Sequence, residues 1–184
     1  MILPIYLYGQ AVLRKETEEI TADYPNLPQL LENMYETLVK SEGVGLAAPQ
    51  VGLAIRLFIL DLRPLADEEL QYKDYTKTFI NPEIIEYSDE TDTSEEGCLS
   101  IPGIHESVAR SKKVLINYLD ENFVEHEEWF EGFPARAIQH EYDHLEQKMF
   151  VDRINPIRKQ LIKAKLSNVI KGRVYCDYKT KAQR

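Results

Sequence analysis

Apolar positions follow helical spacing near both ends of the chain and strand-like patterns in its middle. In Pro28–Lys40 they recur three and four residues apart, which predicts an amphipathic helix that ends near Gly43. The apolar positions of that helix are Leu30, Leu31, Met34, Leu38 and Val39. The segments Ile55–Leu62 and Thr78–Asn81 are rich in β-branched and aromatic residues, so they predict strands.

The next part of the chain predicts antiparallel strands. Val108, Val114–Tyr118 and Phe123–Phe130 carry their apolar positions, and Asp120–Asn122 supplies a turn between the last two. The preceding segment, Asp89–Glu96, is strongly acidic and predicts a solvated loop.

Two helices are predicted after these strands. Pro134 suits the first position of a helix and no breaker follows it, so we expect a helix over Pro134–Gln147. Asn155 as N-cap and Pro156 after it open a last helix that runs to about Ile170. Strands in the middle and helices at the flanks indicate an α+β fold rather than alternating βαβ units.

The length and composition predict one globular domain over residues 1–184. Of the 184 residues, 43% are hydrophobic. No apolar run approaches the roughly 18 residues of a membrane span, and the first residues lack the layout of a signal peptide, so we expect a cytoplasmic protein. Two cysteines, Cys98 and Cys176, cannot form a disulfide framework. Each is a candidate buried thiol, metal ligand or nucleophile.

The net charge of −9 is unevenly distributed along the chain. Residues 1–152 carry 12 Lys and Arg against 30 Asp and Glu, whereas residues 153–184 carry 10 against one acid, Asp177. The basic helix and tail of residues 153–184 predict contact with an anionic partner. Alternatively, these basic residues only balance the negative charge of residues 1–152 within the molecule. The negative charge of residues 1–152 argues against a general DNA-binding protein.

The sequence HEYDH, His140–His144, lies inside the predicted helix Pro134–Gln147. Residues four apart on a helix lie about 40° apart around its axis, so both imidazoles can reach one metal ion. Glu141 lies about 100° round from His140, close enough to hold a water without binding the ion. This spacing is typical of metal-dependent hydrolases in which the Glu is the general base. The alternative is a polar helix face that carries two histidines by chance.

A third ligand decides between classes of hydrolase. The zinc-protease extension HExxHxxGxxH is absent because positions 147 and 150 are Gln147 and Phe150, and no acid occurs between Arg153 and Cys176. Cys98, in the segment EGCLS, is a better candidate, since a thiolate and two imidazoles bind a divalent ion and leave a fourth position for water. The alternative is that Cys98 is a small core residue.

A further segment, Gly43–Gln50 with the sequence GVGLAAPQ, offers two glycines and a side-chain amide. The glycines let the backbone approach a ligand closely or adopt positive φ, and Gln50 could donate to an oxyanion. On its own, the segment is more typical of a glycine-rich turn beside a surface glutamine.

In this order, GVGLAAPQ, EGCLS and QHEYDHL resemble the three signature motifs of the peptide deformylase family. The start of the chain, YGQAVLRKETEEI, is also similar, and the resemblance runs from about Ile5 to Phe150. The chain departs from the family pattern at His105, where many relatives have Arg, and at Ala135–Ala137. The segment Arg63–Lys77 also looks longer than in shorter relatives.

The resemblance implies antiparallel strands packed around a central metal-binding helix, with a C-terminal helix. It implies a hydrolase that removes the N-formyl group from the N-terminal formylmethionine of nascent polypeptides and releases formate. Cys98, His140 and His144 would hold one divalent ion per chain. In the family that ion is commonly Fe(II), and Zn, Ni or Co can also occupy the site.

The resemblance also assigns roles around the ion. Glu141 would be the general base, while Gln50 and the backbone N–H of Leu99 would stabilise the oxyanion. The substrate backbone would lie as an added strand against Val44–Gly45 on one side and Gly97 on the other. The basic C-terminal helix would contact the ribosome near the tunnel exit, with no DNA or membrane partner.

Residues around the motifs give four more expectations. Glu96 and Asp143 are candidates to orient the imidazoles, with Arg110 as a possible partner of Asp143. We expect His105 to border the substrate site and His126 to lie on a strand surface, and we expect neither to bind the metal.

Two other functions are alternatives. One is an HExxH zinc peptidase with an unrecognised third ligand. The other is a structural zinc site, which would need a fourth protein ligand that the motifs do not offer.

Overall fold

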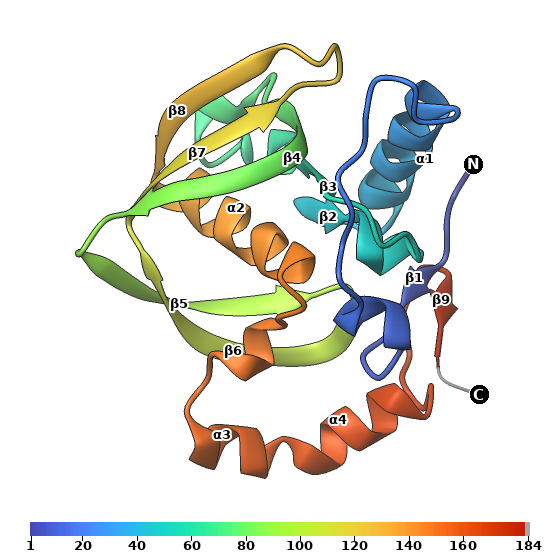
Figure 1. Cartoon of the computed structure of the whole chain (residues 1–184). Coiled ribbons are helices and arrows are strands. Elements are labelled where there is room, and N and C mark those ends of the chain that lie inside the picture. Colours follow the sequence, from blue (N-terminus) through green and yellow to red (C-terminus); the bar gives the residue numbers. More distant parts are fainter. Residues whose placement is uncertain (183–184) are drawn as a thin grey trace.

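The computed structural model describes residues 1–182 and contains three sheets with helices between and around them (Figure 1). The largest sheet has the antiparallel order β2-β3-β4-β7-β8. Its strands are β2 (Gly45–Ala47), β3 (Leu57–Asp61), β4 (Thr76–Tyr87), β7 (Lys113–Leu119) and β8 (Glu125–Glu131). A separate antiparallel ribbon consists of β5 (Thr91–Cys98) and β6 (Ile101–Ser111). Near the termini, β1 (Ile5–Tyr6) pairs in parallel with β9 (Thr180–Lys181).

Helix α2 (Gly132–Leu145) lies between the five-stranded sheet and the β5–β6 ribbon (Figure 1). Ala135 and Ile138 pack against apolar side chains of the sheet, among them Phe58 and Phe79, whose ring centroids lie 4.5 Å apart. The predicted arrangement of antiparallel strands around a central helix is therefore confirmed. The helix begins two residues before Pro134 and ends two residues before the predicted boundary.

Helix α1 (Leu27–Lys40) covers the β2–β3 side of the molecule (Figure 1). Met34 and Leu38 are fully buried in the cluster that it forms with these strands, as the periodicity predicted. Val39 was wrongly assigned to the apolar face, since it is 56% exposed. Short 3-10 helices connect the other elements and are Ala11–Arg14, Ala48–Val51, Arg63–Leu65, Leu70–Tyr72 and Phe150–Asp152.

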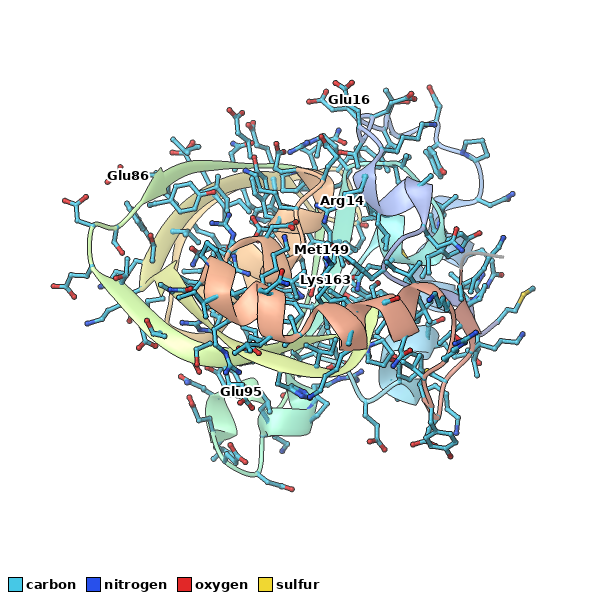
Figure 2. The ribbon with its side chains drawn as sticks, turned by 90° about the horizontal axis from the view of Figure 1, so that it is seen from below. Arg14, Glu16, Glu86, Glu95, Met149 and Lys163 are labelled. Carbon is cyan, nitrogen blue, oxygen red and sulfur yellow. The ribbon has the colours of Figure 1, made fainter. Side chains whose placement is uncertain are left out.

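The predicted last helix is two helices, α3 (Pro156–Leu161) and α4 (Lys163–Ile170). Figure 2 looks onto both helices from below, with Lys163 labelled at the start of α4. The break at Ile162, where ψ is 1°, buries that side chain in a cluster with residues of β6 and leaves Leu161 exposed. The expected N-cap is present, because the side chain of Asn155 accepts a hydrogen bond from the backbone N–H of Ile157.

Two strand predictions needed correction. The acidic segment Asp89–Glu96 is mostly strand β5 rather than a loop, because its backbone pairs with β6 from Thr91 to Glu96. β4 runs six residues beyond the predicted end at Asn81, through an irregular register with β7. Within residues 1–182, no helix is both long enough and apolar enough to cross a membrane.

Candidate metal centre

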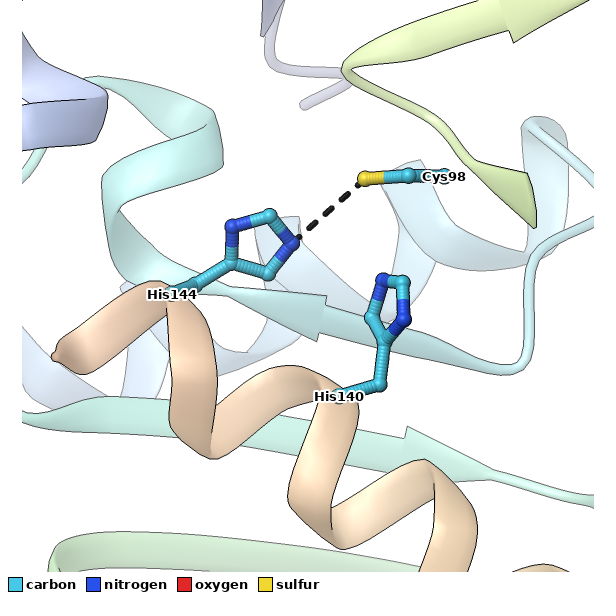
Figure 3. Close-up of side chains that lie close together, drawn as sticks. All are labelled: Cys98, His140 and His144. Carbon is cyan, nitrogen blue, oxygen red and sulfur yellow. Dashed lines mark hydrogen bonds between the residues drawn. The ribbon is translucent and has the colours of Figure 1, made fainter. Parts of the chain in front are cut away.

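Helix α2 presents His140 and His144 on one face, one turn apart, with ring centroids separated by 5.3 Å. Cys98 faces them from the end of β5, and its Sγ lies 3.4 Å from Nε2 of His144. Figure 3 shows the thiol and both imidazoles turned toward one region between the strand and the helix. The structure thus brings Cys98 of the second motif to the two histidines of the third, more than 40 positions away in the sequence.

These three ligand atoms fit a divalent ion. Sγ of Cys98 and one ring nitrogen of each histidine all lie within 4.8 Å of one another, the one such group found in residues 1–182. In a tetrahedral site with bonds of about 2.0–2.3 Å, ligand atoms lie roughly 3.5 Å apart. One thiolate and two imidazoles suit Fe(II) or Zn(II), and three protein ligands leave a position for water or substrate.

The two imidazoles have opposite pKa shifts. Burial lowers the pKa of His144, and the positive charges of His140 and Arg110 lower it further. Burial also opposes protonation of His140, but hydrogen bonds with Cys98 and Glu96 outweigh it and raise its pKa. Since only a neutral imidazole binds a metal, an ion in this site competes with the proton on His140.

Glu96 holds His140 in place. Its carboxylate accepts hydrogen bonds from Nδ1 of His140 at 2.9 Å and from Nε of Arg110 at 2.7 Å. Nη1 of Arg136 donates a further bond at 2.8 Å. Burial alone would raise the pKa of this carboxyl, but Arg110 and His140 hold it well below its usual range. The ionised carboxylate fixes the ring through Nδ1 and leaves Nε2 for a metal, as expected for Glu96.

Arg110 joins this carboxylate to Asp143. Its Nη1 donates to Asp143 at 2.7 Å, and Arg153 donates to the same carboxylate at 2.5 Å. Arg110 is 3% exposed, so a buried cation links β6 to both β5 and α2. The expected pairing of Arg110 with Asp143 is confirmed. Asp143 itself contacts arginines rather than an imidazole, so it supports the site only indirectly.

The Glu141 carboxylate is buried beside the imidazoles, and its Oε2 has no hydrogen-bond partner among residues 1–182. Burial raises its pKa to about 7, although a cation beside it would lower that value. The same carboxylate lies against the backbone of Gly45, where a Cβ atom would overlap it. The Glu141 carboxylate therefore requires a glycine at position 45.

Gln50 is buried rather than on the surface, at 1% exposure in the 3-10 helix Ala48–Val51. Its Oε1 accepts a hydrogen bond from the backbone N–H of Ala47 at 2.8 Å. Its Nε2 therefore points the other way, 3.3 Å from Oγ of Ser100 and 3.5 Å from Sγ of Cys98. The amide is thus held with its donor toward the thiol.

A cleft of about 720 Å³ opens over the three converging side chains. Of the nine residues predicted from the sequence, eight line the cleft, and His144 is buried behind this lining at 1% exposure. The eight are Val44, Gly45, Gln50, Gly97, Cys98, Leu99, His140 and Glu141. All three sequence motifs therefore contribute to the cleft.

The other two histidines, His105 and His126, lie in the positions predicted from the sequence. The ring of His105 covers Gly97 at the border of the cleft, so that a Cβ on Gly97 would lie 2.6 Å from it. His126 lies on β8, bonded to Asp120 at 2.9 Å and stacked on the ring of Tyr118. Neither belongs to the group of ligand atoms found in residues 1–182.

One wall of the cleft was not predicted. Tyr175–Tyr178, from the segment after α4, form it. No sequence pattern predicted this, because the segment has no periodicity and lies outside the motifs. Phe133 and Arg136 of α2 also line the cleft, and Arg136 occupies the position where the sequence departed from the family pattern.

The sequence pattern of the polypeptide deformylase family matches residues 2–160. The chain belongs to the polypeptide deformylase family. It is 48% identical to the peptide deformylase of Christiangramia forsetii, over 97% of this chain and 95% of the relative. Against that of Flavobacterium psychrophilum the identity is 50%, over 98% and 97% of the two chains.

Solved deformylase structures share the fold. The structure of a Plasmodium falciparum peptide deformylase has a TM-score of 0.82 at 34% identity, over 91% of this chain and 95% of that one. The Thermotoga maritima peptide deformylase has a TM-score of 0.76 at 40% identity, over 85% and 99%. Members of the family are metal-dependent hydrolases that remove the N-formyl group from nascent chains. This chain is such an enzyme, which favours the deformylase function over the zinc-peptidase alternative.

Proposed function

We propose that Cys98, His140 and His144 hold one divalent ion per chain and that Glu141 is the general base of deformylation. The observation that carries this proposal is the buried carboxylate of Glu141, with Oε2 unpartnered among residues 1–182, beside a converging thiol and two imidazoles. We propose Fe(II) as the native ion, by resemblance to the family, with Zn, Ni or Co able to replace it.

The ion, when bound, supplies Lewis acidity toward a water molecule and the formyl oxygen. Glu141 removes a proton from the attacking water while the bond from its oxygen to the formyl carbon forms. The same carboxylate then passes the proton to the amine nitrogen as the carbon–nitrogen bond breaks. The products are formate and a peptide with a free N-terminal methionine.

Two donors of this chain stabilise the negative charge on the formyl oxygen in the proposed mechanism. Nε2 of Gln50 is one, because the bond from Ala47 to Oε1 already directs it toward Cys98. The backbone N–H of Leu99, next to the thiol ligand, is the other. Losing a single donor of this kind typically lowers the rate about 10²–10³-fold.

The edge of the sheet offers the place for the substrate backbone. β2 is the terminal strand in the order β2-β3-β4-β7-β8, and Val44 and Gly45 at its start line the cleft. Gly97, near the end of β5, lines the facing side. We propose that the formylmethionyl peptide binds between them as an added strand, with backbone hydrogen bonds to both.

Replacing Glu141 by alanine tests the base. Metal content measured by mass spectrometry should stay near one ion per chain, while anaerobic formate release should fall about 10²–10⁴-fold. Glu127→Ala, an exposed position on β8, is the matched control and should change neither quantity. A variant that folds without metal would make Glu141 a ligand, and one with parental activity would remove it from the mechanism.

The ribosome contact is a second proposal, and it concerns α3 and α4. Ile157 and Leu161, four residues apart on α3, are 72% and 66% exposed. Lys163 and Lys165 follow Leu161 in the chain and are also exposed. Exposed lysines can bind the phosphates of RNA, and an exposed apolar pair can pack on a protein, so together they fit the mixed surface of the ribosome. The cytoplasmic ribosome is also where formylated chains emerge.

The alternative, compensation of the acidic body, accounts for part of the basic segment. Arg158 pairs with Glu106 at 2.8 Å and Lys159 with Asp152 at 2.8 Å. We therefore assign the ribosome contact to the exposed residues of α3 and α4 alone. We also propose that residues 1–184 are one domain, to whose core α4 contributes Leu166 and Val169.

Charge reversal tests the contact better than truncation would. Cutting the chain after Asn155 would remove Leu166 and Val169 from the core, together with one wall of the cleft. Lys163→Glu with Lys165→Glu should instead abolish salt-sensitive co-sedimentation with ribosomes and leave hydrolysis of a short formyl peptide unchanged. Ribosome binding equal to that of the parent would exclude this surface.

A further inference from the structure

The segment Tyr175–Tyr178, which lines the cleft, lies beyond residue 160, where the match to the family pattern ends. It is anchored by the pairing of β9 with β1. The backbone N–H of Ile5 donates to Lys179 at 2.8 Å, and that of Leu7 donates to Lys181 at 2.9 Å. The wall is therefore tied to the N-terminal strand.

The side chain of Tyr178 extends from this wall to Leu99, the residue after Cys98. Its hydroxyl donates a hydrogen bond to the backbone carbonyl of Leu99 at 2.8 Å. Both side chains pack at the margin of the same apolar cluster. Burial raises the pKa of the Tyr178 phenol, so its hydroxyl stays protonated and remains a donor at neutral pH.

Other contacts hold the neighbours of the Leu99 carbonyl. The Leu99 side chain packs on Gly43, where an added Cβ would lie 3.0 Å from Cδ1. The carbonyl of Ser100 accepts a hydrogen bond from the N–H of Tyr8 at 2.8 Å. Tyr178 acts between these points, on the carbonyl that fixes the Leu99–Ser100 peptide plane. The Leu99 N–H lies in the neighbouring Cys98–Leu99 peptide plane, and the two planes meet at the Leu99 Cα. With Cys98 on one side and the Leu99 carbonyl held on the other, the φ and ψ angles of Leu99 are restricted, and with them the direction of its N–H.

We infer that Tyr178 is a positioning residue for deformylation, which holds Leu99 so that its N–H points to the oxyanion. The inference rests on the proposed role of Leu99 as an oxyanion donor. This role would make the segment Tyr175–Tyr178 part of the active site. The hydrogen bond acts on the transition state through Leu99 and has no direct contact with the substrate in this role.

Tyr178→Phe removes the hydroxyl and keeps the ring. Since the donor is misdirected rather than lost, kcat should fall about tenfold, less than the 10²–10³-fold typical of a deleted donor. KM for a formyl-Met peptide and the metal content should stay unchanged. Tyr6→Phe is the matched control, because the Tyr6 hydroxyl accepts from Lys181 at 3.0 Å in the same junction of the termini but does not touch Leu99. It should keep the parental kcat.

A spectroscopic measurement separates positioning from general loosening. The sequence contains two Leu-Ser pairs, Leu99–Ser100 and Leu166–Ser167, so labelling with ¹³C-carbonyl leucine and ¹⁵N serine gives two peptide signals. In the full-length zinc-loaded protein, Tyr178→Phe should move the Leu99 carbonyl signal and leave that of Leu166 in place. An unmoved Leu99 signal, or equal losses of kcat in Tyr178→Phe and Tyr6→Phe, would overturn the inference.

Gln50→Ala tests the oxyanion donors separately. If it leaves kcat unchanged, the proposed oxyanion arrangement fails, and the inference fails with it. If Gln50→Ala lowers kcat while Tyr178→Phe keeps the parental value, the arrangement stands and only the role of Tyr178 is overturned.

Discussion

Replacing Arg110 by methionine should destabilise the protein and weaken metal binding. Arg110 is almost fully buried and donates to two carboxylates that are nearly as buried, Glu96 and Asp143. Methionine is apolar and flexible, so it fills most of the same space without a charge or a donor. The substitution therefore removes the ion pairs while it keeps much of the packing.

The structure sets the size of the effect. Breaking a buried ion pair usually costs about 3–5 kcal/mol, because the remaining charge stays buried without its partner. Glu96 keeps its bonds from Arg136 and His140 in this variant. Asp143 keeps Arg153, so we expect the lower end, about 3 kcal/mol. At about 2–4 °C per kcal/mol for a chain of this size, Tm should fall by about 6–12 °C.

Thermal unfolding of the metal-free and metal-loaded protein measures this effect, and chelator competition measures metal binding. We expect metal affinity to fall about 10–100-fold, because Glu96 would hold His140 less firmly. Lys112→Met is the control, since its pair with Glu90 is exposed and worth at most about 1 kcal/mol. A fall in Tm of less than about 3 °C for Arg110→Met, or an equal fall for both variants, would refute the reasoning.

Three further predictions concern single residues. Gly45→Ala should abolish most activity, because the added methyl overlaps the Glu141 carboxylate; a parental kcat would contradict this packing. Cys98→Ser should lower the metal content, whereas Cys176→Ser should not, because its thiol is outside the ligand group; equal contents would exclude Cys98 as a ligand. Burial opposes ionisation of Asp152, but hydrogen bonds from basic neighbours lower its pKa to about 2, below the unfolded value of about 3.9. It therefore stabilises the fold above about pH 4 and loses this effect as the pH falls toward 2. Urea-unfolding curves of Asp152→Asn and the parent should differ at about pH 6 and converge toward pH 2; a constant difference would contradict this.

Periodicity predicted the elements whose apolar faces meet an apolar core. α1 follows the expected spacing closely, because Met34 and Leu38 are buried at the predicted face. α2 was predicted instead from Pro134 and the absence of a later breaker. The candidate metal group was also accessible from the sequence, since His140 and His144 lie one turn apart on a single helix. Cys98 could be named as a third ligand from its chemistry and from the lack of downstream candidates, but no local rule predicts that β5 ends beside α2.

Other features depended on contacts that the sequence pattern does not reveal. β5 was taken for a loop because its inward residue, Glu96, faces arginines instead of an apolar core. The bend at Ile162 has no glycine or proline to announce it, and it follows from packing that side chain against β6. Tyr178 gave no signal at all, since its partner is a backbone carbonyl 79 residues away.

The parallel pair of β1 and β9 joins residues that are nearly a whole chain length apart, since Tyr6 and Lys181 are separated by 175 in sequence number. Closing so long a loop costs more conformational entropy than forming the hairpins of the central sheet, and only two residues on each strand repay it. We therefore expect this pair to form last during folding and to open first in the native state. Synthesis from the N-terminus delays it further, because β9 is made after nearly all of the rest. A newly made enzyme would thus bring Cys98, His140 and His144 together before its cleft is complete.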